Sequence, residues 1–140
     1  MGGLHFEVNH YIVLMSFYKQ KLERVQKEVY GNQRHLDAVI AIKNYIDKHL
    51  ESKLDLDKLS EIHEISKYHL IRIFKRYYGI TPKQYIISKR VEKSKELLKA
   101  GQSVTQTCFA VGFESLGSFS QLFKEKTGMS PHNFRTSNFQ

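Results

Sequence analysis

The chain has 140 residues, a hydrophobic content of 41% and a formal net charge of +8. This length fits one domain or two very small ones, and the apolar content excludes a disordered tail. The longest apolar run, Tyr11–Met15, is too short to cross a bilayer, so we expect no membrane span. A single cysteine, Cys108, excludes an internal disulfide bond and fits a cytoplasmic chain.

The positive charge is concentrated in the middle of the chain. Residues 1–65 carry 9 Lys/Arg against 10 Asp/Glu, residues 66–100 carry 10 against 2, and residues 101–140 carry 3 against 2. The net charges are therefore −1, +8 and +1, so the whole excess lies in residues 66–100. A localised basic face is typical of a nucleic-acid-binding protein.

Two helices are predicted before the basic region. Residues 9–30 carry an apolar stripe that favours a dimerisation or domain-linking helix. The alternatives are a helix that packs on its own domain and the tail of a missing upstream domain. Gly31-Asn32 should break it, and a second helix should run from about His35 to His49. The second helix should bury one apolar face, made of Leu36, Val39, Ile40 and Ile46.

A short helix and a longer one should follow. Asp55 is a suitable N-cap for a helix over Leu56–His63, with Leu59 and Ile62 facing inward. After a tight turn, Ser66 should cap a helix that ends before Gly79. The expected buried face of this longer helix is made of Leu70, Ile73, Phe74 and Tyr77. A short helix, a turn and a longer basic helix favour a helix-turn-helix.

The same order of elements then recurs. Thr81-Pro82 should start a helix that runs to about Lys99 and ends at Gly101. A capping box over 103–106 should open a short helix with Val104, Cys108 and Val111 facing inward. Further helices should begin after Ser115 and Ser130 and contain 116–127 and 131–137, with Gly128 between them.

An internal repeat with an offset of 49 residues connects the two halves. Its identical pairs are Ser66/Ser115, Phe74/Phe123, Lys75/Lys124, Gly79/Gly128 and Pro82/Pro131. Four more pairs match in chemical kind, namely Leu70/Phe119, Ile73/Leu122, Thr81/Ser130 and Tyr85/Phe134. The repeat predicts two copies of one supersecondary unit, with one long helix between them.

These residues resemble a known family. The segment GFESLGSFSQLFKEKTGMSPHNFR (112–135) is similar to the C-terminal signature of AraC/XylS-type bacterial transcription regulators. The segment SKYHLIRIFKRYYGITPKQYI (66–86) is similar to the first helix-turn-helix of the same family. The likeness covers about residues 36–135, whereas residues 1–34 do not resemble the effector-binding domain of the family.

The resemblance implies an all-α fold. We expect two homeodomain-like helix-turn-helix units, about seven helices in all, plus an extra N-terminal helix. The predicted domains are an extension or linker over 1–34 and a DNA-binding domain over 35–140. Within the latter, the first helix-turn-helix takes about 55–79, the linker helix 82–100, the second helix-turn-helix about 103–128 and a terminal helix 131–137.

The resemblance also implies that the helices over 66–78 and 115–127 enter successive major grooves of double-stranded DNA. The predicted base contacts are Lys67, Tyr68, Ile71, Arg72, Leu116, Gly117, Ser120 and Gln121. Arg72 is the strongest candidate, because its planar fork can pair with guanine. The predicted phosphate contacts are Lys75, Arg76, His69, Lys124, Thr81, Ser130 and His132. The basic residues Lys89, Arg90, Lys93 and Lys95 either contact DNA or form a solvated face.

The second copy departs from the family pattern. Gly117-Ser118 stand where the family often has a serine and an aromatic residue, Gln121 stands where arginine is common, and Thr107-Cys108 replace Ile-Ala. We therefore expect the first recognition helix to supply most of the base reading and the second mainly to set the register.

The predicted function is a sequence-specific regulator of transcription that acts on double-stranded DNA, with RNA polymerase as a further partner and a homodimer through 9–30 as an open alternative. The competing hypothesis is a basic helical module for protein interaction or for an anionic membrane surface. No metalloprotease, Walker or nucleophile-elbow motif and no Cys/His ligand spacing is present. We therefore expect no enzymatic activity, catalytic residue, metal site or cofactor, and a structural role for Cys108.

Overall fold

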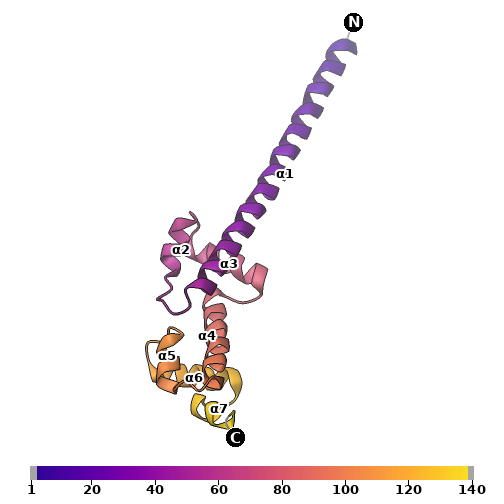
Figure 1. Ribbon diagram of the computed structural model, residues 1–140. Coiled ribbons are helices and arrows are strands. Elements are labelled where there is room, and N and C mark those ends of the chain that lie inside the picture. The colour runs from indigo at the N-terminus through magenta and orange to yellow at the C-terminus, as the bar shows by residue number, and fades with distance from the viewer. Residues whose placement is uncertain (1–2, 139–140) are drawn as a thin grey trace. The chain divides into compact units, whose positions relative to one another are not determined.

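A computed structural model describes the backbone of residues 3–138 and the side chains of residues 8–138 (Figure 1). The described residues form helices joined by short turns, and none of them lies in a β-strand. In chain order the helices are α1 (Gly3–Lys48), α2 (Leu56–Ile62), α3 (Lys67–Tyr78), α4 (Pro82–Lys99), α5 (Val104–Ala110), α6 (Leu116–Thr127) and α7 (Pro131–Ser137). The all-α prediction is confirmed, while the outer ends of the two predicted domains, 1–2 and 139–140, lie outside the described residues.

The predicted helix break at Gly31-Asn32 is wrong. Residues 9–30 and 35–48 belong to one 46-residue helix, α1, instead of two, and His49 follows its end. A glycine inside a helix costs only about 1 kcal/mol relative to alanine, and good helix formers on both sides outweigh this cost. One turn later, the Gln33 amide donates a hydrogen bond to the Asp37 carboxylate at 2.9 Å, which links successive turns of α1.

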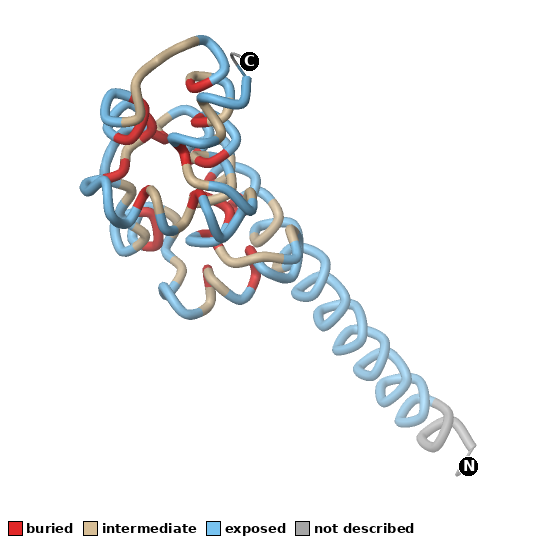
Figure 2. Tube along the Cα trace, turned by 90° about the horizontal axis from the view of Figure 1, so that it is seen from below, coloured by how far each residue is buried: buried red, intermediate tan, exposed pale blue. Residues whose placement is uncertain are grey.

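The chain divides into two compact units between Ala38 and Val39. In the first unit, the α1 residues from Val8 to Tyr30 are exposed all around the helix (Figure 2). The second unit, from Val39 onward, contains the end of α1 and all the shorter helices. It buries two separate apolar clusters, one for each half of the predicted repeat.

The first cluster joins the end of α1 to α2, α3 and the start of α4. Its members are Val39, Ile42, Ile46, Leu50, Leu59, Leu70, Ile73, Phe74, Tyr85 and Ile86. The Tyr85 hydroxyl donates a hydrogen bond to the Asp47 carboxylate at 2.7 Å and so attaches α4 to α1. Burial raises the pKa of Asp47, but hydrogen bonds from Tyr85 and Lys43 outweigh it and hold that pKa below its ordinary value.

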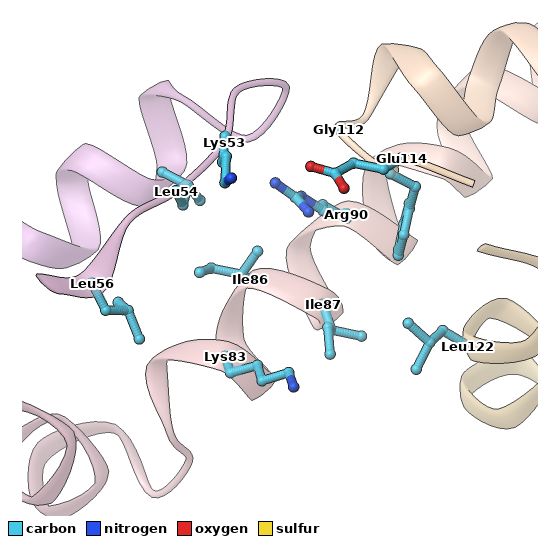
Figure 3. Close-up of a pocket in the computed structure, with 11 residues that line it drawn as sticks. Lys53, Leu54, Leu56, Lys83, Ile86, Ile87, Arg90, Gly112, Glu114 and Leu122 are labelled. Atoms are coloured by element: carbon cyan, nitrogen blue, oxygen red, sulfur yellow. The ribbon is translucent and has the colours of Figure 1, made fainter. Parts of the chain in front are cut away.

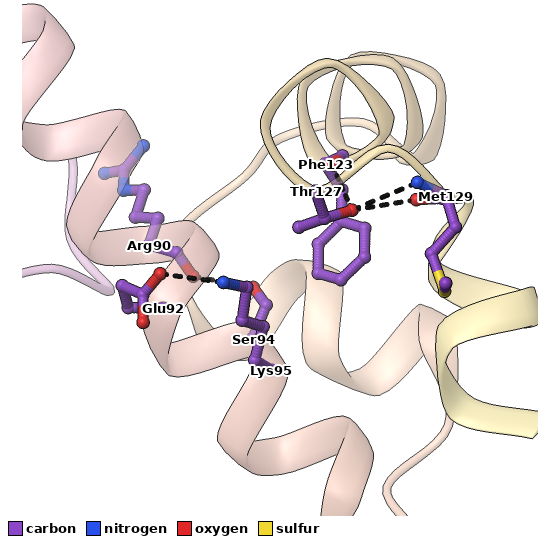
Figure 4. A network of polar contacts seen from close by, with 7 residues as sticks. All are labelled: Arg90, Glu92, Ser94, Lys95, Phe123, Thr127 and Met129. Carbon is purple, nitrogen blue, oxygen red and sulfur yellow. Dashed lines mark hydrogen bonds and ion pairs between the residues drawn. The ribbon is translucent and has the colours of Figure 1, made fainter. Parts of the chain in front are cut away.

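The second cluster joins the end of α4 to α5, α6 and α7. It consists of Val91, Leu98, Cys108, Val111, Phe113, Phe119 and Phe123, with Phe134 packed against it. The aromatic rings pack in series at steep angles to one another, with 5.7 Å between the centroids of Phe119 and Phe123 and 5.3 Å between those of Phe123 and Phe134. At the end of α6 the Thr127 hydroxyl donates to the Phe123 carbonyl at 2.7 Å (Figure 4).

Three residues that were expected to face inward are exposed instead. Ile40 is 42% exposed, Ile62 63% and Tyr77 40%. Ile42 is fully buried and Tyr78 packs on Phe74, so the buried stripe lies beside the predicted positions. These expectations failed because helical spacing alone cannot distinguish the centre of a buried face from its edge.

The repeat extends further in the structure than in the sequence. Helices α2 and α5 match at an offset of 48 residues, so the turn before α6 is one residue longer than the turn before α3. In both turns one residue has a positive φ, 52° at Glu64 and 99° at Gly112. The following N–H donates to an equivalent carbonyl, Ile65 to Ser60 and Phe113 to Cys108.

Candidate nucleic-acid interface

Helix α3 begins and ends as its sequence predicts. The Ser66 hydroxyl accepts a hydrogen bond from the His69 N–H at 3.2 Å, and Gly79 adopts a left-handed φ of 78° after the last turn. Leu70, Ile73 and Phe74 are buried on one face. Because this face is fixed in the core, the residues on the other side of α3 must point outward.

The outward face of α3 holds the residues that were predicted to touch bases. Tyr68 is 82% exposed, Arg72 is exposed, and Ile71 is half-buried. Lys67 is also exposed, but its ammonium lies 3.1 Å from the carboxylate of Asp57 on α2. This ion pair, which was not expected from the sequence, joins α3 to the first turn of α2, where Asp57 lies.

Helix α6 repeats this arrangement with different side chains. Ser115 caps it, Phe119 and Phe123 are buried, and Gly128 ends it at a φ of 85°. Among the predicted base contacts on α6, Leu116, Gly117 and Gln121 are exposed and Ser120 is half-buried. The Gln121 amide donates a long hydrogen bond, 3.4 Å, to Glu125 on the next turn.

The predicted phosphate contacts fall into two groups. Lys75, Arg76, Lys124 and His132 are exposed, whereas His69, Thr81 and Ser130 are half-buried. The Thr81 hydroxyl accepts from the Gln84 N–H at 3.2 Å, and the Ser130 hydroxyl accepts from the Asn133 N–H at the same distance. These two hydroxyls therefore cap the helices α4 and α7.

Helix α4 connects the two halves, and its basic residues do not form a uniform solvated face. Arg90 is half-buried, and its guanidinium donates to the carbonyl oxygens of Leu50 and Ser52, each at 3.0 Å. The same guanidinium carbon lies 5.7 Å from the centroid of the Phe113 ring. Burial lowers the pKa of Arg90, and the nearby charge of Glu114 opposes that shift.

Gly112 allows the turn before α6 to lie close to Arg90 and Leu50, because glycine has no Cβ atom. A Cβ atom at this position would lie 2.3 Å from the Leu50 carbonyl oxygen and 2.9 Å from Arg90 Nη2. A groove of about 420 Å³ opens beside this contact, between the segment that precedes α2 and the turn that precedes α6 (Figure 3). Arg90 was expected either on DNA or in solvent, whereas the structure shows it bonded to the protein itself.

The described residues hold no group of three or more His, Cys, Asp or Glu side chains that could bind a metal ion. Cys108 is fully buried, and burial raises the pKa of its thiol, so its predicted structural role is confirmed. Within the described residues, no helix is long and apolar enough to span a membrane.

Comparison with known proteins decides the family. A family model described as a helix-turn-helix domain matches residues 59–137. The multiple antibiotic resistance protein MarA of Escherichia coli is 34% identical over 112 residues, which are 78% of this chain and 88% of MarA. The chain belongs to the AraC/XylS-type family of transcription regulators.

Two further comparisons show how much of its relatives this AraC-type chain covers. It is 39% identical over 95 residues to AdaA of Bacillus subtilis, a bifunctional transcriptional activator and DNA repair enzyme. The match covers 67% of this chain but 45% of AdaA, so the chain spans about half the length of such relatives. The DNA-binding domain of AdpA, solved in complex with a target DNA, superposes with a TM-score of 0.67 at 25% identity, over 71% of this chain and 90% of that one.

Proposed function

We propose that the domain over 35–140 binds a specific double-stranded DNA sequence by inserting α3 and α6 into successive major grooves. The observation that supports this proposal is that α3 and α6 repeat the same arrangement, in which each of the two helices buries one face and leaves the other exposed. Helix α4 has 18 residues and spans about 27 Å. This length, with the offsets of the flanking helices, suits groove segments about 34 Å apart.

The two recognition helices have different roles in this proposal. Helix α3 carries Lys75 and Arg76 in its last turn and Arg72 on its exposed side, so it provides most of the base reading and much of the phosphate binding. Helix α6 offers Gln121, which Glu125 already engages, and mainly sets the register. Lys124 and His132 add phosphate contacts near the second groove.

The wider setting is also part of the proposal. The chain acts in the cytoplasm, where bacterial DNA lies, as a regulator without enzymatic activity whose effect on RNA polymerase depends on the position of its site. The stripe on residues 9–30 joins two copies into a homodimer. Under the competing hypothesis, a basic module for anionic membranes would bind anionic vesicles as tightly as DNA.

The decisive experiment is selection of sites from random DNA at physiological salt, followed by competition with unrelated DNA. We expect an enriched motif with two parts about one helical turn apart. Enrichment of no motif would overturn the proposal and leave a non-specific basic protein.

Two variants separate base reading from phosphate binding. Arg72→Ala should weaken binding to the selected site by about 10-fold to 100-fold and relax one base position. Lys75→Ala should weaken all sequences equally and reduce the salt dependence of binding by about one phosphate contact. Equal effects of both substitutions on every sequence would contradict the assigned roles.

A further inference from the structure

The exposed part of α1 carries far more apolar surface than a lone helix can keep in water. Every described side chain from Val8 to Tyr30 is exposed, including Tyr11 at 67%, Met15 at 56% and Leu22 at 63%. Helices in proteins owe most of their stability to packing of an apolar face, and large exposed apolar patches mark interaction sites. This segment therefore requires a partner.

The spacing of the apolar residues identifies the geometry of that partner. Steps of three and four residues alternate without interruption along α1, through Val8, Tyr11, Met15, Tyr18, Leu22, Val25, Val29, Asn32 and Leu36. This alternation is the pattern of the core positions in a coiled coil. Leu36 is half-buried and the next member, Val39, is fully buried in the first apolar cluster, so the free part of the stripe ends near Asn32.

We propose that residues 8–32 of α1 pair with the same residues of a second copy in a parallel, in-register two-stranded coiled coil. The proposal deepens the homodimer in the proposed function and rests on it only for its biological purpose. A second copy fits because a parallel pair places each apolar residue against its own equivalent. Both chains then leave the coil at the same end, where Val39 begins the DNA-binding unit.

Asn32 and the flanking charges favour the parallel direction. In a parallel pair, Asn32 faces its own equivalent, and the two amides can bond to each other within the apolar core. In the antiparallel pairing that matches the same stripe, Tyr11 faces Val29 and Asn32 faces Val8, whose apolar side chain offers the amide no hydrogen bond. Beside the parallel seam, Lys21 would face Gln26 and Glu28 would face Gln33, so no like charges meet.

Cysteine substitution in the full chain tests the direction. Tyr11→Cys and Val29→Cys lie on the seam near opposite ends, and Lys27→Cys lies on the outer face as a control. Under mild oxidation we expect each seam variant to form a covalent dimer on its own, while Lys27→Cys and the unchanged chain, whose Cys108 is fully buried, do not. Cross-links only in a mixture of the two seam variants would show an antiparallel pair and overturn the proposal, as would their complete absence.

Sedimentation equilibrium measures the strength of the pair. Leu22→Asp should raise the dissociation constant of the dimer about 100-fold because it places a charge in the seam, while Gln20→Asp on the outer face should change it about 2-fold or less. Equal effects of both, or a monomeric unchanged chain, would refute the coil. Site selection with the unchanged chain is a separate measurement. An enriched DNA motif without dimers would refute the coiled coil alone. Dimers without an enriched motif would refute the DNA-binding proposal alone.

A second, independent inference concerns Arg90. Its guanidinium bonds to the segment after α1, which leads into α2 and α3, and it covers Phe113 in the turn that leads into α6. The geometry points to Arg90 as a positioning residue that fixes the spacing of the two recognition helices. This inference rests on the proposed two-groove binding, whose own test is the selected motif.

A spacing assay tests this role. One base pair inserted between the two parts of the selected site should weaken binding of the unchanged chain about 10-fold, whereas Arg90→Ala should reduce this penalty to about 2-fold and keep the base preference of each part. Lys93→Ala, an exposed position on the same helix, is the control and should keep the full penalty. Arg90→Lys keeps the charge without the guanidinium fork and should give an intermediate penalty. An unchanged penalty in both Arg90 variants would overturn the role, and a two-part motif would still support the proposed function.

Discussion

The two helix-turn-helix units are close copies in their frames and different in their outer faces. Ser66 and Ser115 cap the recognition helices in the same way, and Gly79 and Gly128 end them with φ angles of 78° and 85°. The exposed residues between these ends differ at almost every position. Packing and capping must be satisfied in each copy, whereas the surface is free to diverge toward a task.

The outer faces of the two recognition helices differ mainly in their charge. Helix α3 carries Lys67, Arg72, Lys75 and Arg76 and no acidic residue. Helix α6 carries Lys124 and Lys126, but Glu125 lies between them and engages Gln121. The first copy thus has more positive charge for binding phosphates, and both arginines of the recognition helices, Arg72 and Arg76, lie on α3.

The turns before the recognition helices differ for a structural reason. Glu64 adopts a left-handed φ of 52° in the first turn, and Gly112 takes the equivalent place in the second. Gly112 also lies against the Leu50 carbonyl and Arg90, where a Cβ atom has no room. The turn before α6 therefore helps to connect the two helix-turn-helix units, and the turn before α3 does not.

The largest effect on stability is expected at Gly112, in the turn before α6. Gly112→Ala should lower the free energy of unfolding by about 3 kcal/mol, since it combines a strained left-handed alanine with a clash against backbone. Glu64→Ala is the matched control in the other copy and should change it by about 0.5 kcal/mol or less. Urea denaturation measures both, and similar losses at the two positions would contradict the difference between the turns.

A smaller effect on stability is expected at Tyr85, which lies in the first apolar cluster as Phe134 lies against the second. Tyr85 and Phe134 occupy equivalent positions, but Tyr85 alone bonds to Asp47. Tyr85→Phe should cost about 1 kcal/mol at neutral pH, because Asp47 loses one of the bonds that lower its pKa. Tyr68→Phe, at an exposed position, should cost nothing measurable.

The pH dependence gives this prediction a sign. A carboxyl group with a lowered pKa in the folded state contributes stability above its unfolded pKa, and this stability is lost as the pH falls through the folded pKa. The difference between the unchanged chain and Tyr85→Phe should therefore shrink as the pH falls below about 4. A difference that stays constant down to lower pH would show that Asp47 is not the partner that matters.

The smallest expected effect is a gain in stability. Glu64→Gly should raise the free energy of unfolding by about 0.5 kcal/mol, because relief of the left-handed strain slightly exceeds the entropy cost of glycine. Thermal unfolding detects such a change as a shift of a few degrees. A loss of stability would indicate that the Glu64 side chain itself holds the turn.

The sequence predicted the repeated frame well because caps, glycine ends and apolar spacing are local signals. It failed where the decisive partner lies far along the chain. Arg90 bonds to Leu50 and Ser52, some forty residues earlier, and Lys67 pairs with Asp57 on another helix. The break at Gly31 failed for the opposite reason, since one weak local signal was outweighed by the good helix formers around it. The roles of the residues on α3 and α6 remain predictions.

The central claim is that α3 reads most of the sequence and α6 mainly sets the register. Affinities for the selected site with every base pair changed in turn, measured for the unchanged chain, Arg72→Ala and Gln121→Ala, test it most directly. We predict that one part of the site carries most of the specificity, that Arg72→Ala removes about 10-fold or more of it there, and that Gln121→Ala leaves the profile within about 2-fold. Equal specificity in both parts, or a larger loss with Gln121→Ala, would contradict the account.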